Sequence, residues 1–199
     1  MKRIVIGIVL AAILPAAAGA AEVRSEYTEI DLEKTCAIFD VAPDDESFAS
    51  YACSGWRGYP VLVYAADARE SVVYGFPSSS DHVWESFSGL NQTAAKVEWR
   101  IEVDGERQVP FAAIHRWYVH ADAENPEKRT EVLVVEKVGQ PGSGESCAVG
   151  LVVASGNPKA NETARKIADE QARDFACEAD ERVVVSGDVA LPEFSRQEN

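Results

Sequence analysis

The sequence has little of what catalytic and nucleic-acid-binding proteins commonly carry. Only three of its 199 residues are histidines, four are cysteines, and 19 lysines and arginines stand against 33 aspartates and glutamates. Such an excess of negative charge repels nucleic acid and anionic lipid. The chain also lacks HExxH, CxxC, GxSxG and SxxK motifs, and no glycine-rich phosphate loop precedes a helix. We therefore assign no catalytic residue, no metal site and no cofactor, and we expect no nucleic-acid partner.

A long hydrophobic run occurs at the N-terminus. Residues 4–14 are apolar, Lys2 and Arg3 precede them, and residues 18–20 have the small-x-small pattern of a cleavage site. The run is too short for a membrane span, which needs about 20 apolar residues. We expect residues 1–20 to be a signal peptide, the protein to be periplasmic or secreted, and no membrane attachment after signal removal. Removal of the signal leaves 17 basic and 33 acidic residues, a net charge of −16.

The remaining chain is long enough for one domain with a real core. We expect residues 21–190 to form a single globular domain and residues 191–199 to be a flexible tail. Runs of alternating or continuous apolar residues predict strands over most of the domain, and one long apolar stripe near the C-terminus predicts a helix. The predicted fold class is α+β: a mainly antiparallel sheet of about six to eight strands, with one long C-terminal helix packed on one face.

The segment between Cys147 and Cys177 organises this expected fold. Residues 147–154 are an apolar run typical of a buried strand, and residues 155–158 interrupt it with turn-forming residues. From Pro158 onward, apolar residues recur at helical spacing as far as Ala176. A strand of about 26 Å and a helix of about 28 Å have similar lengths. A helix that folds back along its own strand therefore returns Cys177 to the end where Cys147 lies.

All four cysteines lie in the exported part of the chain. An even number in an exported protein indicates disulfides, and four cysteines allow three connectivities. The strand–helix geometry favours Cys147–Cys177, which leaves Cys36–Cys53 as the second pair. A zinc site is the alternative, but no paired cysteine and histidine spacing accompanies the cysteines.

Residues 96–120 give the clearest hairpin pattern. Apolar residues from Val97 to Val103 alternate with charged ones, which predicts one buried and one solvated face. A three-residue loop beginning at Asp104 pairs Trp99 with Phe111 and keeps the apolar face continuous, so we expect this register.

One segment has the composition of a binding surface. Trp56, Arg57 and Tyr59 lie in a loop that glycine and proline punctuate. Tryptophan, tyrosine and arginine are enriched at interface hot spots, and aromatic faces also stack on sugars. The alternative is structural: the two aromatic rings close the end of a sheet, and the arginine meets one of the many acids.

Two stretches resemble a family of small exported bacterial proteins of unknown function. The first is CSGWRGYPVLVYAADARESVVYG, from Cys53, and the second extends from EVLVVEKVG to the segment that ends at Cys177. The hallmarks are the Cys-x-Gly-x-x-Gly-Tyr-Pro segment at residues 53–60 and the Asn-Pro start of the last helix. The resemblance implies a periplasmic location and two cysteine pairs, and it implies no activity.

Three functions fit these features. The leading hypothesis is a non-catalytic periplasmic protein that binds an envelope component or a protein partner. A basic partner suits the acidic chain, and one specific form is inhibition of a basic wall-degrading enzyme such as a lysozyme. The second is a hydrolase of cell-wall sugar or peptide that uses paired carboxylates. The third is a module that binds wall polysaccharide through Trp56 and Tyr59.

Overall fold

The computed structural model describes residues 21–42, 45–77, 83–120, 125, 127–142 and 144–197. The expected signal peptide lies outside these residues. The described chain forms twelve strands in three sheets and one short α-helix, with 57% of residues in strands and 9% helical. The predicted α+β class with one long helix is therefore wrong, and the protein is mainly β. No helix among the described residues has both the length and the apolar character needed to cross a membrane.

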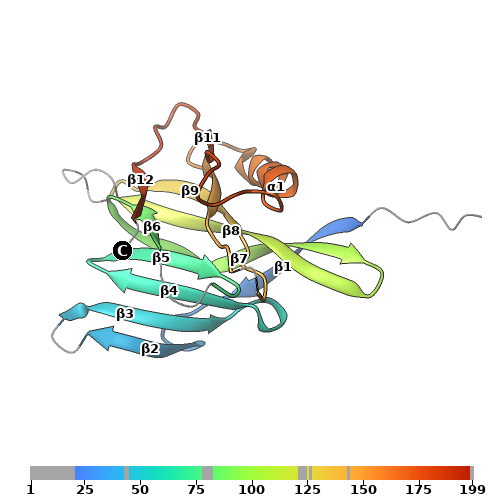
Figure 1. The fold of residues 1–199 in the computed structure, drawn as a ribbon. Helices are drawn as coiled ribbons and strands as arrows, with labels where there is room; N and C mark the ends of the chain where they lie inside the picture. Colours follow the sequence, from blue (N-terminus) through green and yellow to red (C-terminus); the bar gives the residue numbers. More distant parts are fainter. Residues whose placement is uncertain are drawn as a thin grey trace, which may run out of the picture.

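The sheets use strands from distant parts of the chain (Figure 1). The six-stranded sheet has the order β1 (Glu22–Glu29), β7 (Leu90–Asp104), β8 (Arg107–His120), β9 (Thr130–Lys137), β10 (Ala148–Val153) and β11 (Val183–Val185). The four-stranded sheet has the order β2 (Cys36–Ala42), β3 (Asp45–Ser54), β4 (Pro60–Ala66) and β5 (Arg69–Tyr74). The third sheet pairs β6 (Trp84–Phe87) with β12 (Phe194–Gln197). All neighbouring strands are antiparallel except β10 and β11.

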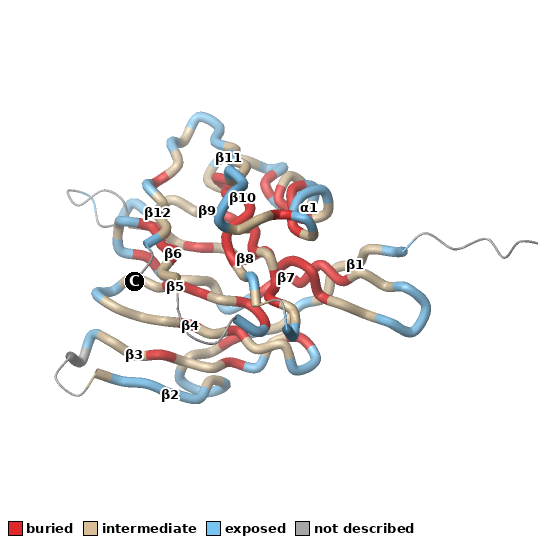
Figure 2. Tube along the Cα trace, viewed as in Figure 1, coloured by how far each residue is buried: buried red, intermediate tan, exposed pale blue. Residues whose placement is uncertain are grey.

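Three layers result, because the six-stranded sheet is covered on both faces. One face meets the four-stranded sheet, with Trp99, Trp117 and Tyr74 fully buried between them. The other face meets α1 (Ala160–Gln171), whose Ala164 and Ala168 have no exposed surface. Figure 2 shows the buried residues concentrated in the middle sheet and on the side of α1 that faces it. The strand expected at residues 147–154 is confirmed as β10, and all six of its residues are buried.

Two disulfides close this architecture. Cys147 and Cys177 are joined with 5.8 Å between their Cα atoms, and Cys36 and Cys53 with 4.1 Å. These are the pairs that the strand–helix geometry favours. The first links the start of β10 to the chain beyond α1, and the second links the paired strands β2 and β3.

The helix is shorter than its apolar stripe predicts. It begins at Ala160 rather than Pro158 and ends at Gln171. Beyond Gln171, side chains take over the backbone hydrogen bonds: Lys137 Nζ donates to the Phe175 carbonyl at 2.7 Å, and the Ala176 N–H donates to Asp180 Oδ2 at 2.9 Å. Such local partners compete with helical hydrogen bonds. Phe175 still packs in the core beneath α1, so the apolar stripe outlasts the helix.

The hairpin register also differs from the expected one. The turn contains two residues, Gly105 and Glu106, and Asp104 is paired with Arg107. Further along, the register shifts between Ile101 and Arg100, so Trp99 lies opposite Ala113 and not Phe111. The bulge lets Phe111 pack beneath α1, while Trp99 packs in the other core.

The face of β7 that was expected to be solvated lies beneath α1. Glu98 and Arg100 are 7% and 8% exposed. Arg165 of α1 donates to Glu98 at 2.6 Å, and Asp169 of α1 accepts two hydrogen bonds from Arg100, at 2.8 and 2.6 Å. Hydrogen bonding by Glu98 raises the pKa of Arg165, so this guanidinium is held in its charged form. Ion pairs thus replace apolar contacts where the helix crosses β7.

The expected C-terminal tail is instead partly ordered. Phe194 to Gln197 pair with β6, and the Phe194 ring packs against Phe87 with 4.8 Å between ring centroids. Arg196 donates to the Cys177 carbonyl at 2.9 Å. Apart from residues 198–199, which lie outside the described chain, these contacts attach the C-terminal segment to the body.

Substitution of Gly150 tests whether α1 packs closely on β10. An added Cβ would lie 2.7 Å from Ile167 Cγ2 and 3.3 Å from the Val183 carbonyl oxygen. Because this overpacks the core, Gly150→Ala is expected to lower the free energy of unfolding by about 1–3 kcal/mol, measured by denaturant titration. Gly187→Ala is the matched control, since its Cβ meets nothing within 4 Å. Equal stability of the two variants would contradict the packing described here.

Candidate functional site

The loop proposed as a binding surface is mostly part of the core. Trp56 begins a 3-10 turn (Trp56–Gly58) and is only 4% exposed, and its indole N–H donates to Glu26 at 2.5 Å. Tyr59 is half-buried and donates to Gln140 at 2.9 Å. Arg57 is exposed at the tip, with its guanidinium 4.9 Å from the Trp56 ring centre. The three residues lie together, but the Trp56 ring is buried and the Tyr59 ring is only partly exposed, so the loop does not present two open aromatic faces to a sugar.

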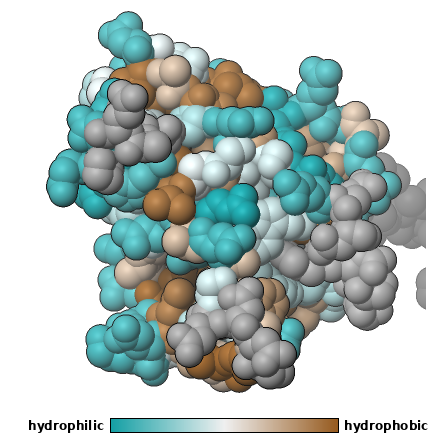
Figure 3. Space-filling view, turned by 90° about the vertical axis from the view of Figure 1, so that its left-hand side faces the viewer, coloured by the Kyte–Doolittle hydropathy of each residue, from teal (hydrophilic) through white to brown (hydrophobic). Residues whose placement is uncertain are grey.

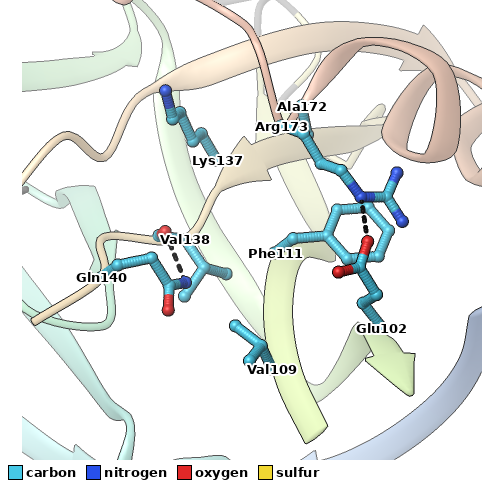
Figure 4. Close-up of a pocket in the computed structure, with 8 residues that line it drawn as sticks. All are labelled: Glu102, Val109, Phe111, Lys137, Val138, Gln140, Ala172 and Arg173. Carbon is cyan, nitrogen blue, oxygen red and sulfur yellow. Dashed lines mark hydrogen bonds and ion pairs between the residues drawn. The ribbon is translucent and has the colours of Figure 1, made fainter. Parts of the chain in front are cut away.

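A shallow pocket lies between the β7–β8 hairpin and the end of α1 (Figure 4). Its volume of about 170 Å³ is below the range of common ligand sites, about 300–1,000 Å³. Its polar groups already have protein partners: Arg173 donates to Glu102 at 2.7 Å, and Gln140 donates to the Pro110 carbonyl at 2.7 Å. The pocket is a packing defect beside Phe111 and offers no converging free groups.

The most evident carboxylate pair, Glu85 and Glu136, is buried. Glu136 is 2% exposed and Glu85 is 8% exposed. Burial raises the pKa of both carboxyl groups, while Arg182 and Arg196 act in the opposite direction. The Ala148 N–H donates to Glu85 at 2.8 Å. A glycosidase needs its carboxylates on either side of a bound sugar, and this pair is closed to a substrate.

His115 is a second buried titratable group. Its ring has no exposed surface, and burial lowers its pKa to about 4. Nε2 lies 2.5 Å from the Ala94 carbonyl, which can only accept, so this nitrogen carries the hydrogen. Nδ1 therefore accepts from the Tyr74 hydroxyl at 2.6 Å. The imidazole is neutral and fully paired, which suits a structural histidine.

No group of three histidines, cysteines, aspartates or glutamates is placed to hold a metal ion within the described chain. His82 falls outside that part of the chain.

Strand β2 exposes its apolar side chains. Ile38, Phe39 and Val41 are 60%, 53% and 54% exposed, although β2 is paired with β3 along its other side. Figure 2 shows β2 exposed along most of its length. Figure 3 shows hydrophobic residues at the bottom of the molecule, at the height where Figure 1 places β2 and β3. The edge therefore combines apolar surface with open backbone.

The strand is held rigidly in this exposed position. The Cα distance of 4.1 Å between Cys36 and Cys53 marks a non-hydrogen-bonded pair. The backbone groups of Cys36 consequently point away from β3, as do those of Ile38, before the register shifts between Ile38 and Asp40. No other described strand pairs with this side of β2. Phe39 sits at an irregularity in the register and packs edge-on against Tyr64, with ring centroids 6.0 Å apart.

Negative charge surrounds β2. Residues 29–42 include four acidic residues and one basic residue, Lys34. Lys34 forms an ion pair with Asp31, whose carboxylate lies 2.8 Å from Nζ. Hydrogen bonding by Lys34 lowers the pKa of Asp31. Asp40, in the middle of β2, is exposed. The net charge of residues 29–42 is thus −3, and these residues form β2 and the chain that leads into it.

The other sheet edges are short, charged or covered. At one edge of the six-stranded sheet β11 has only three residues, and at the other β1 has charged residues at alternate positions. The free side of β5 is covered by β6, where Ser86 Oγ donates to the Glu70 carbonyl at 2.7 Å and the Glu85 N–H donates to Ser71 Oγ at 3.1 Å. Proteins usually protect long apolar edges. We therefore take the β2 edge as the candidate functional site.

Sequence reasoning did not nominate this edge. It predicted strands over most of the domain, and the candidate sites it named were the aromatic loop and a carboxylate pair. The available signal was the run of apolar residues at successive positions, Ala37 to Phe39, which cannot all be buried in a half-covered strand.

In comparisons with known proteins, no family model, no curated protein and no solved structure matches this chain. The family resemblance in the sequence therefore assigns no role to any residue.

Trp56→Ala tests whether the aromatic loop belongs to the core. Removal of a buried indole should lower the free energy of unfolding by about 3–5 kcal/mol, measured by denaturant titration. Arg57→Ala, which truncates an exposed neighbour, should change it by less than about 0.5 kcal/mol. A stable Trp56→Ala protein would show that the ring is not part of the packing.

His115→Gln tests the buried imidazole. The folded-state pKa of about 4 lies below the ordinary 6.5, so the unfolded state binds more protons between these values. Stability should therefore fall as the pH drops from about 6.5 to about 4, by about 3 kcal/mol in total, and then level off. Glutamine keeps one donor and one acceptor but does not titrate, so this part of the pH dependence should disappear.

The measurement is the free energy of unfolding of both proteins across that pH range. Glu70, Glu85 and Glu136 have raised pKa values and act with the opposite sign. Because these groups are present in both proteins, the difference between the two curves isolates His115. Parallel curves would contradict a neutral buried imidazole.

Proposed function

We propose that this chain is an exported, disulfide-linked binding protein that engages a basic protein of the cell envelope. Its specific form is inhibition of a basic wall-degrading enzyme such as a lysozyme. The observation that carries the proposal is the β2 edge: exposed apolar side chains on a disulfide-linked strand, in a segment (residues 29–42) whose net charge is −3.

Electrostatics support a basic partner. After signal removal the net charge would be −16. Several of the basic side chains are occupied within the fold, including Arg100, Arg165 and Arg173, which pair with Asp169, Glu98 and Glu102. Excess acidic groups are thus left to face solvent. Such a surface speeds association with cationic proteins and repels anionic ones.

The two disulfides support an oxidising compartment. Disulfides persist in the periplasm and outside the cell and are rare in the cytosol. The apolar run at residues 4–14 fits export through a signal peptide that is then removed. A periplasmic location would also place the protein beside wall-degrading enzymes.

A hydrolase and a sugar-binding module receive less support. Glu85 and Glu136 are buried, and the Trp56 ring is packed in the core. A binding protein needs no acid–base pair in a cleft. A protein partner can contact the exposed β2 edge directly.

The test is an inhibition assay with the mature chain, residues 21–199. The expected result is inhibition of wall lysis by a lysozyme at low salt, and weakening by at least about tenfold when the ionic strength rises to about 0.5 M. An acidic wall hydrolase is the control and should be unaffected. If no basic wall-degrading enzyme in a panel is bound or inhibited at low salt, the proposal fails.

A further inference from the structure

We infer that β2 is a docking strand: an extended segment of a basic partner adds to the four-stranded sheet along the free edge of β2. The inference rests on the proposed function for the partner's charge, and it adds the mode of binding and the residues involved. It makes Ile38, Phe39 and Val41 contact residues that no motif identifies.

The backbone supplies the first part of the recognition. β2 is seven residues long and ends the strand order of its sheet. An incoming strand can pair with the outward N–H and C=O groups, as in other peptide complexes that extend a sheet. The Cys36–Cys53 disulfide and the pairing with β3 fix these groups before the partner arrives. Little conformational entropy is then lost on the β2 side.

The side chains supply the second part. Ile38 lies opposite Tyr51, and the Phe39 ring packs on Tyr64, so apolar surface is offered at two neighbouring positions of the edge. Asp40 lies between Phe39 and Val41, and Asp31 and Glu33 precede the strand. The complementary segment alternates apolar and basic side chains, which cover the edge and pair with the acids.

A second copy of this chain is a poorer occupant. Two β2 strands joined edge to edge would bring their Asp40 residues and their acidic flanks together. Like charges directly opposite each other in a sheet are destabilising, and residues 29–42 of each copy have a net charge of −3. Charge therefore favours a basic segment over self-association.

The experiment uses the mature chain and an eight-residue peptide of alternating valine and lysine. Binding is followed by fluorescence anisotropy, and protection of the β2 amides by hydrogen exchange. Two control peptides are matched to it: one is N-methylated at alternate residues, so it keeps its charge but cannot pair along one side, and the other has glutamate in place of lysine. We expect the first peptide to bind with new protection at β2, and both controls to bind at least about tenfold more weakly.

Variants locate the site. Ile38→Lys places a positive charge on the edge and should weaken peptide binding by at least about tenfold. Val184→Lys is the matched control, because Val184 is 53% exposed on the distant edge strand β11 and should change binding by less than about twofold. Circular dichroism and thermal unfolding of both variants show whether the fold is kept. If Ile38→Lys does not fold, the N-methylated peptide and the hydrogen-exchange map still decide the question.

Each outcome separates the inference from the proposed function. Equal binding of the N-methylated peptide, or protection away from β2, overturns strand addition even if a lysozyme is inhibited. Peptide binding at β2 without inhibition of any basic enzyme supports the docking strand while the proposed function fails. Concentration-dependent dimers in which Ile38→Lys abolishes association, with no peptide binding, would assign the edge to a second copy and overturn the inference.

Discussion

The six-stranded sheet is covered on both faces, and the rest of the structure depends on this constraint. One face is matched by another apolar sheet, whereas the other must accommodate Glu98 and Arg100 beneath α1. The helix supplies Arg165 and Asp169 to neutralise them, because a buried charge without a partner would be strongly unfavourable. Gly150 then allows close approach at β10, and the Cys147–Cys177 disulfide ties the chain beyond the helix to the start of its strand.

The sequence predicted those parts of the fold in which buried positions carry apolar residues, and it failed where buried positions are polar. β9 and β10 are continuous apolar runs, so their buried positions were readable, and the helix-on-strand geometry favoured the Cys147–Cys177 pair that the structure contains. β6 was not readable, because its Glu85 and Ser86 are polar yet buried through hydrogen bonds. The fold class was wrong because the chain forms twelve strands in three sheets, and because the helix ends at Gln171 while its apolar stripe continues. The spacing of apolar residues indicates which side chains are buried. It does not indicate which group each backbone N–H and C=O bonds to.

The candidate site was less predictable than the fold. Trp56 had the right composition for a hot spot, but composition does not say whether a ring faces outward, and the ring is buried. Exposure of the β2 side chains depends on the strand order, since β2 is an edge only because β3 pairs with β4 on its other side. That order is set by contacts between segments far apart in sequence, which no local pattern encodes.

An apolar edge strand is normally a hazard, so its persistence here needs a physical account. The Cys36–Cys53 disulfide keeps β2 on its own sheet, which opposes exchange of the strand with another molecule. The irregularity at Phe39 and the charge of Asp40 weaken pairing with an identical edge. Neither device hides the apolar side chains or the open backbone. Together they oppose pairing with like-charged strands and leave the edge open to basic ones, which is the selectivity that the proposed docking strand requires.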